Sequence, residues 1–313
     1  MPQSTVAKGP NKISKTNGAN WLDTSLFPFE SKFIHLASGQ MHYIDEGEGD
    51  ILLFVHGTPT WSFLYRHLVK ELSKEYRCIA IDHIGFGLSE KPTSFDGKPE
   101  SHSKNLLEFI ELLQLEDITM VVHDFGGPIG IGAAIQIEPQ IKSMVLFNTW
   151  LWETKYNPEV KKVHRMLNSP LGKFLYLKLN FSAKVLLKQG FHDKQKLTKT
   201  IHGHYKSPFP NTKSRLGPWN IGKELLGSSQ WYQDQWEKLP ALATKPWLII
   251  WGDKDRFISM GYLEKWKNRL YNLRTVVVDS GHFVQEERPS EAIAQIKIFM
   301  QDIQRLPKDP LDP

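Results

Sequence analysis

The chain has 313 residues, of which 40% are hydrophobic and 23% charged, so it can form one large α/β domain with an insertion or two ordinary domains. No apolar run approaches the roughly 18 residues that a membrane-spanning helix needs. The formal net charge of +5 comes from scattered lysines rather than from a cluster beside a nucleic-acid motif. We therefore expect neither a membrane nor a nucleic acid as a partner. The single cysteine, Cys78, excludes a disulfide within the chain and is typical of a cytoplasmic protein.

The first third of the chain begins with a polar arm and then alternates apolar runs with amphipathic segments. Residues 1–20 contain no apolar block, so we expect a loose arm there. Two apolar runs on either side of a Ser-Gly pair predict a hairpin over residues 33–45. Buried strands and amphipathic helices are then predicted in turn over residues 51–55, 61–74, 77–81 and 103–115.

The stretch from Ile118 to Ile135 is the one around which the rest of the chain is organised. A β-branched apolar run ends at a His-Asp-Phe-Gly-Gly turn and passes straight into a helical pattern. Such a strand-turn-helix holds one side chain in a strained, exposed position at the top of a sheet, as in a nucleophile elbow. That side chain is Asp124. Taken alone, the turn is equally typical of an aspartate that caps a helix N-terminus.

The second half of the chain interrupts the alternation once. A strand is predicted over residues 141–147, after which short helical segments divided by prolines extend to residue 239. Two further strands and a closing helix follow. We therefore predict an α/β fold with an eight-stranded, mostly parallel sheet, a core formed by residues 1–147 and 240–313, and an inserted helical cap over residues 148–239.

Two polar residues follow the last two predicted strands. Asp255 lies in the turn after the first of these strands, and His282 follows the second. Because the carboxyl ends of parallel strands share one edge of a sheet, Asp124, Asp255 and His282 are expected to converge there. This convergence favours a catalytic triad over three unrelated turn residues. Glu153 and Asp253 are the weaker candidates for the acid.

The chain resembles the α/β-hydrolase superfamily, and within it the branch with an aspartate nucleophile that holds haloalkane dehalogenases and epoxide hydrolases. The resemblance extends from Phe33 to the closing helix. It is carried by the motifs His56–Trp61, Asp82–Ser89, His123–Gly127, Gly252–Asp255 and Gly281–Glu287.

The resemblance implies that the backbone N–H groups of Thr58 and Phe125 form an oxyanion hole. A carboxylate is already ionised at neutral pH and can attack an electrophilic carbon directly. Asp124 would then form an alkyl ester, which water activated by His282 would hydrolyse while Asp255 orients the imidazole. This chemistry needs no metal and no organic cofactor. The expected partners are a small apolar electrophile and water, and the oligomeric state stays open.

The preferred reaction is haloalkane dehalogenation, with epoxide hydrolysis as the alternative and a ligand-binding sensor on the same scaffold as a third hypothesis. Dehalogenases usually carry Trp after the nucleophile and Asn after the His-Gly pair, where this chain has Phe125 and Thr58. Indole N–H groups could hold a halide and tyrosines could protonate an epoxide oxygen; the candidates are Trp150, Trp152, Trp219, Trp231, Tyr156, Tyr176, Tyr205 and Tyr232. The substrate pocket is predicted to include His56, Trp61, Trp150, Trp152 and Phe283.

Overall fold

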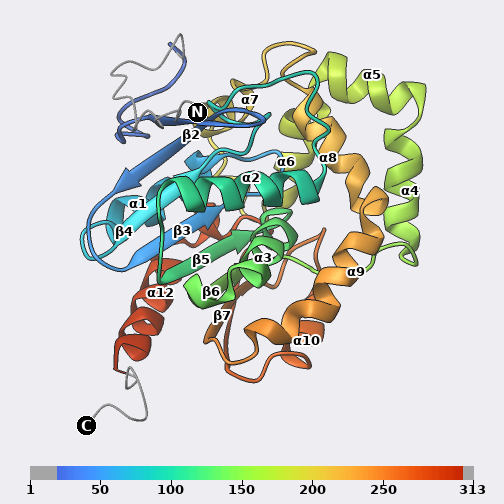
Figure 1. Ribbon diagram of the computed structural model, residues 1–313. Coiled ribbons are helices and arrows are strands. Elements are labelled where there is room, and N and C mark those ends of the chain that lie inside the picture. Colours follow the sequence, from blue (N-terminus) through green and yellow to red (C-terminus); the bar gives the residue numbers. More distant parts are fainter. Residues whose placement is uncertain (1–19, 306–313) are drawn as a thin grey trace, which may run out of the picture.

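The computed structural model describes residues 20–305 and has an eight-stranded sheet at its centre (Figure 1). The strands are β1 (Lys32–Leu36), β2 (Gly39–Glu46), β3 (Ile51–Val55), β4 (Arg77–Ile81), β5 (Ile118–His123), β6 (Ile141–Phe147), β7 (Trp247–Gly252) and β8 (Leu273–Val278). Their spatial order is β1-β2-β4-β3-β5-β6-β7-β8. β2 runs antiparallel to both of its neighbours, and all other adjacent strands are parallel. The predicted fold class is confirmed.

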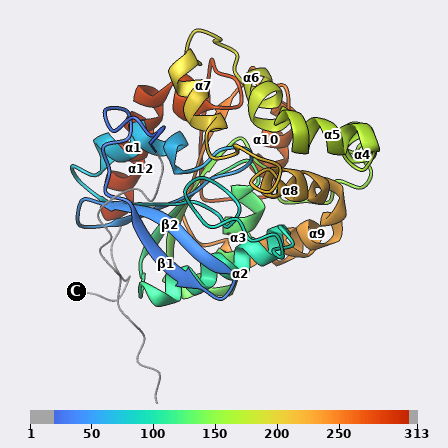
Figure 2. The same ribbon diagram turned by 90° about the horizontal axis from the view of Figure 1, so that it is seen from above.

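Helices cover both faces of the sheet (Figure 2). α1 (Arg66–Leu72) and α12 (Pro289–Gln304) pack together on one face, while α2 (Pro99–Leu112) and α3 (Gly126–Gln136) pack together on the other. Shorter elements complete this part of the chain: η1 (Ser62–Tyr65), η2 (Glu138–Gln140), η4 (Leu239–Leu242), α10 (Met260–Lys267) and α11 (Val284–Glu287). In the part of the chain that the structure describes, no helix is both long and apolar enough to cross a membrane.

The segment between β6 and β7 contains helices and turns but no strand. Its elements are α4 (Pro158–Leu167), α5 (Pro170–Leu179), the π-helix η3 (Ser182–Leu186), α6 (Leu187–Gly190), α7 (Lys199–Lys206), α8 (Leu216–Gly227) and α9 (Ser229–Lys238). The oxygens of Asn157, Ser169 and Thr198 accept hydrogen bonds from N–H groups in the first turns of α4, α5 and α7, which fixes where these helices begin. The predicted loose arm lies outside the described residues, apart from Asn20.

A hydrogen bond from this segment to a buried ion pair of the core joins the two parts of the molecule. Arg66 of α1 donates from Nη2 to Glu286 Oε2 of α11 at 2.8 Å, and the Tyr205 hydroxyl of α7 donates to the other carboxylate oxygen. All three side chains are buried. Removing one partner of such a pair typically costs about 3–5 kcal/mol, because a charge is left buried without compensation. The inserted helices are therefore held against the sheet at a defined position.

Candidate active site

Asp124 lies between β5 and α3 with φ of 52°, in the left-handed region. Its neighbours leave no room for side chains: a Cβ on Gly126 would lie 2.2 Å from the Val55 carbonyl oxygen, and one on Gly127 would lie 1.7 Å from Thr149 Oγ1. Thr149 Oγ1 donates to the Asp124 carbonyl oxygen at 2.6 Å, which helps to hold a conformation that costs about 1–3 kcal/mol. The alternative role of Asp124 as a helix cap is not observed, because α3 has no side-chain cap.

The two oxygens of the Asp124 carboxylate have different neighbours. Oδ1 accepts a hydrogen bond from the Thr58 backbone N–H at 2.8 Å, and Oδ2 lies 3.5 Å from His282 Nε2. Gly57 permits this arrangement, since a Cβ there would lie 2.2 Å from Asp124 Oδ1. One oxygen is thus held by a backbone donor while the other is close to the imidazole.

His282 also contacts Asp255, whose Oδ2 lies 2.7 Å from His282 Nδ1. The other oxygen of Asp255 accepts hydrogen bonds from the backbone N–H groups of Phe257 at 2.7 Å and Ile258 at 3.1 Å. The rival acids pair elsewhere, Asp253 with Lys254 and Glu153 with Lys155. The structure therefore brings Asp124, His282 and Asp255 together in one chain of contacts.

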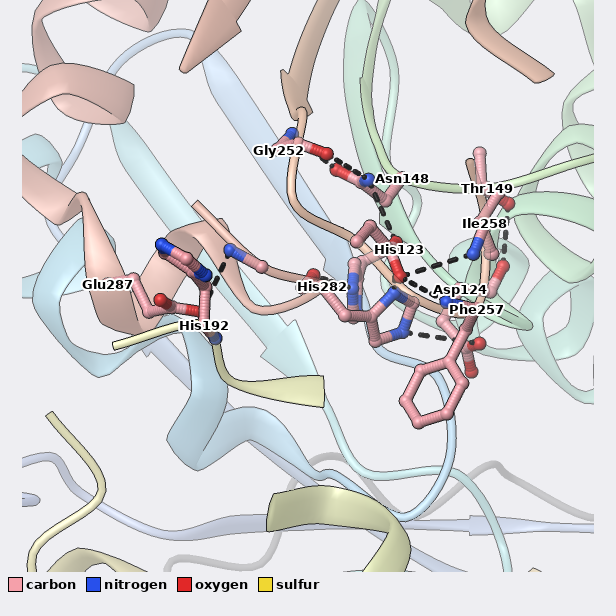
Figure 3. A network of polar contacts seen from close by, with 12 residues as sticks. His123, Asp124, Asn148, Thr149, His192, Gly252, Phe257, Ile258, His282 and Glu287 are labelled. Atoms are coloured by element: carbon pink, nitrogen blue, oxygen red, sulfur yellow. Dashed lines mark hydrogen bonds and ion pairs between the residues drawn. The ribbon is translucent and has the colours of Figure 1, made fainter. Parts of the chain in front are cut away.

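Asn148, which the sequence reasoning did not single out, contacts both Asp255 and Gly252; the contact with Gly252 can be followed in Figure 3. Its Nδ2 donates to Asp255 Oδ2 at 2.9 Å, and its Oδ1 accepts from the Gly252 N–H at 2.8 Å. Asn148 is fully buried and follows β6 directly. The signal was present in the sequence, since a polar residue at the carboxyl end of a parallel strand marks the same edge as Asp124, Asp255 and His282.

The loop that carries His282 is attached to the inserted segment. The His282 N–H donates to the Gly190 carbonyl oxygen at 2.8 Å. Glu287 Oε1 accepts from the N–H groups of Gly281 and His192, each at 3.1 Å (Figure 3). Burial raises the pKa of Glu287, partly offset by these backbone donors. The position of the imidazole therefore depends on both the core and the insertion.

Charge and burial oppose each other at the imidazole. Burial lowers the pKa of His282, but the Asp255 and Asp124 carboxylates outweigh it and raise this pKa to about 10. Burial raises the pKa of Asp255, but His282 and the two backbone donors bring it below its usual value. His123, whose ring lies 4.5 Å from that of His282, has its pKa lowered by burial to about 3. The neighbouring carboxyl groups thus favour the protonated imidazole of His282, whereas burial favours the neutral ring of His123.

A cavity of about 510 Å³ opens beside Asp124 and His282. Thr58, Phe125, Trp150 and Phe283 are among its lining residues, as are side chains of α4, α5, η3 and α8. Most of the lining residues that come from the segment between β6 and β7 are apolar; examples are Val160, Val163, Leu167, Leu186, Leu187 and Leu225. Within residues 20–305, no cluster of three or more His, Cys, Asp or Glu side chains is suited to hold a metal ion. The cavity fits an apolar molecule that reaches Asp124.

Three residues predicted for the pocket do not line this cavity. Trp61 is fully buried in the core, where its Nε1 donates to the His204 carbonyl oxygen at 3.1 Å. His56 is buried as well, and its Nε2 accepts the His83 N–H at 2.9 Å. Trp152 packs against Trp236 and two other aromatic rings. Their polar atoms and rings are used for packing, which proximity to a motif in the sequence cannot reveal.

The candidate donors differ in whether they reach the cavity. Trp150 lines it, and its Nε1 is buried with no hydrogen-bond partner among the described residues, as is the Oγ1 of Thr58. Tyr176 also lines it. The other candidates lie elsewhere: Trp219 Nε1 and the Tyr232 hydroxyl donate to backbone carbonyls, Trp231 packs near Gly132, Tyr205 bonds to Glu286 and Tyr156 is exposed.

Comparison with known proteins identifies the family of this chain. Residues 50–289 match the family described as alpha/beta hydrolase fold. The chain is 33% identical over 277 residues to haloalkane dehalogenase 2 of Mycobacterium tuberculosis, covering 88% of this chain and 96% of that protein. It is 34% identical over 297 residues to a cis-3-alkyl-4-alkyloxetan-2-one decarboxylase of Shewanella oneidensis, covering 91% and 92%.

Among solved structures, a haloalkane dehalogenase from Agrobacterium tumefaciens superposes with a TM-score of 0.81 at 23% identity, covering 90% of this chain and 100% of that one. This likeness concerns the fold. The family match and the two relatives extend over most of the sequence. The chain therefore belongs to the α/β hydrolase fold family and is a hydrolase of the haloalkane dehalogenase and epoxide hydrolase type.

Proposed function

We propose that Asp124 is the nucleophile of a haloalkane dehalogenase-like reaction that converts a haloalkane and water into an alcohol, a halide and a proton. In the first step Asp124 Oδ2 attacks the carbon that bears the halogen. The new C–O bond forms as the carbon–halogen bond breaks, and the halide leaves with the bonding electrons. The contact that supports this assignment best is that of Asp124 Oδ2 with His282 Nε2 at 3.5 Å, while His282 Nδ1 contacts Asp255 at 2.7 Å.

In the second step His282 activates water against the carbonyl carbon of the ester. Alkylation removes the negative charge of Asp124, and with it one of the two carboxylates that raise the pKa of His282. The imidazole then loses its proton more readily and can accept one from water. Negative charge develops on Asp124 Oδ1, which already accepts from the Thr58 N–H. The N–H of Phe125 would be the second donor to this oxyanion, and each such donor is typically worth about 10²–10³ in rate.

The leaving halide requires donors that this chain lacks at the usual positions. Trp150 lies against Phe125, with ring centroids 4.9 Å apart, and a buried indole N–H without a partner costs about 1–3 kcal/mol. We propose that this N–H and the Thr58 hydroxyl donate hydrogen bonds to the leaving halide. The halide would supply the acceptor that the indole N–H lacks when the indole turns toward the cavity.

Decarboxylation of a dialkyl oxetan-2-one is the second candidate, because the cavity is apolar and large and the Shewanella relative carries that activity. Attack of Asp124 on the ring carbon that bears oxygen would break this C–O bond and release a carboxylate. Loss of CO₂ from that carboxylate would then expel Asp124 and leave an alkene, without any water. Epoxide opening, with Tyr176 protonating the oxygen, is the third.

Intact-protein mass spectrometry of the His282→Gln variant separates these reactions. With a bromoalkane, the variant should release one equivalent of bromide and retain the alkyl group as an ester, and Asp124→Asn should retain nothing. With a cis-dialkyl oxetanone, His282→Gln should still form alkene if decarboxylation is the activity, since that route needs no activated water. Diol formed by the parent enzyme from terminal epoxides, without halide from any bromoalkane, would select epoxide hydrolysis. Reversible binding with neither adduct nor turnover would identify a sensor and refute the enzymatic proposal.

A further inference from the structure

The positive charge of this protein is concentrated on one part of the insertion. Residues 158–190 carry seven cationic side chains against the single carboxylate of Glu159, a net charge of +6 in a chain whose whole formal net charge is +5. The seven are Lys161, Lys162, Arg165, Lys173, Lys178, Lys184 and Lys188. None of them forms an ion pair with a carboxylate in residues 20–305, although many lysines elsewhere do.

The same segment exposes large apolar side chains. Of the eleven such side chains that are exposed among the described residues, five lie here: Val163, Leu171, Phe174, Leu179 and Val185. Leu171 is 64% exposed and Phe174 is 51% exposed. With Lys178 they stand at helical positions i, i+3 and i+7, so they share one face of α5. We call the exposed cationic and apolar side chains of residues 158–190 the basic apolar face.

This face is the outer side of elements whose inner side lines the cavity. Val160 and Leu167 of α4 and Ser182 and Leu186 of η3 line the cavity, and Val163 both lines it and is exposed. α4 and α5 lie at the periphery of the molecule, away from the sheet, in both views of Figures 1 and 2. The basic apolar face and much of the cavity wall therefore belong to the same helices.

We propose that the basic apolar face docks onto the surface of an anionic lipid bilayer. Cations interleaved with Leu, Val and Phe combine attraction to acidic headgroups with shallow insertion of apolar side chains, which is the chemistry of a surface-lying helix rather than of a protein contact. Each cation near such a surface strengthens binding about fivefold. This surface revises the expectation of no membrane partner. The inference does not rest on the reaction proposed above, because it concerns side chains that do not touch Asp124.

Flotation with vesicles tests the proposal on the full chain. The protein should bind vesicles of phosphatidylcholine with 30 mol% phosphatidylglycerol, should not bind phosphatidylcholine alone, and should be released by salt. The Lys161→Gln and Lys178→Gln double variant should bind about 25-fold more weakly, on the scale of fivefold per cation. The Leu171→Ser and Phe174→Ser double variant should also lose binding, since its apolar insertion is gone. The control for the lysine variant is the Lys70→Gln and Lys238→Gln double variant, and the control for the apolar variant is Tyr271→Ser. All three control sites are exposed and lie outside the basic apolar face.

None of the substituted residues lines the cavity, so turnover of a water-soluble substrate and the melting temperature serve as checks of folding. Failure to bind anionic vesicles would overturn the proposal. Binding that falls equally in the control variants would overturn it too. The protein could instead be captured by polyglutamate and show no binding to vesicles. If that capture were lost in the variants of the basic apolar face, the face would bind an acidic polypeptide and the lipid partner would be refuted.

Discussion

Replacing Trp150 by Phe should separate a leaving-group donor from a packing residue. Trp150 is 3% exposed, and its ring contacts those of Phe125 and Tyr232 at 4.9 and 5.7 Å. A phenyl ring keeps part of both contacts. The apolar area that is lost would cost about 1–2 kcal/mol, while removing a buried, unpaired N–H returns about 1–3 kcal/mol. The free energy of unfolding should therefore lie between about 1 kcal/mol below and about 2 kcal/mol above that of the parent.

The rate of alkylation should change far more than the stability. Deleting one donor that stabilises developing charge costs about 10²–10³ in rate, or about 2.7–4 kcal/mol. We expect that loss in the bromide burst of the Trp150→Phe variant, measured by stopped flow in the His282→Gln background. Trp152→Phe is the matched control, because Trp152 is buried among aromatic rings but does not line the cavity. Bromide release at the parental rate by Trp150→Phe would refute the assignment of the donor.

Three further predictions concern the groups around the imidazole. Asp255→Asn should slow ester hydrolysis by about 10³–10⁴, the effect typical of losing the acid that orients a catalytic histidine, whereas Glu153→Gln should leave the rate unchanged. Single-turnover decay of the ester measures both rates. A larger effect of Glu153→Gln would contradict the assignment of Asp255. Asn148→Ala should lower the free energy of unfolding by about 1.5–3 kcal/mol in urea, because a hydrogen bond to a buried carboxylate is lost; an unchanged urea midpoint would contradict this. Since the pKa of His282 is raised to about 10 in the folded state, its contribution to stability is complete below its ordinary pKa of about 6.5 and is lost as pH rises through 10. Between pH 7 and 10, the unfolding free energy should therefore fall more steeply for the parent than for His282→Gln; parallel pH profiles would argue against the shift.

Local chemistry explains why the sheet and the elbow could be predicted from sequence. A β-branched run, a turn and a glycine-rich helix are each encoded within a few residues, and the rule that parallel strands end at one edge converts them into a site. The convergence of Asp124, Asp255 and His282 followed from that rule. Asn148 obeys it as well and was overlooked because an amide has no acid or base role of its own.

The walls of the cavity could not be predicted in the same way. Trp61 and Trp152 are of a residue type common in pockets, yet both pack against aromatic side chains that are distant in sequence. Which of several tryptophans retains an unpaired N–H depends on the position of every neighbouring carbonyl. Such information belongs to the packing between the sheet and the insertion, and spacing along the chain does not contain it.

The insertion between β6 and β7 has a consequence for how this protein can change over evolutionary time. It supplies most of the apolar cavity wall, while Asp124, Asp255 and His282 all follow strands of the sheet. Substitutions in α4, α5 or α8 can therefore alter which molecules are admitted without displacing a reacting atom. The exceptions are the contacts of Gly190 and His192 with the histidine loop, where a change in substrate preference would also disturb the chemistry. Sequence changes should therefore accumulate in the outer helices and be rare at Gly190 and His192.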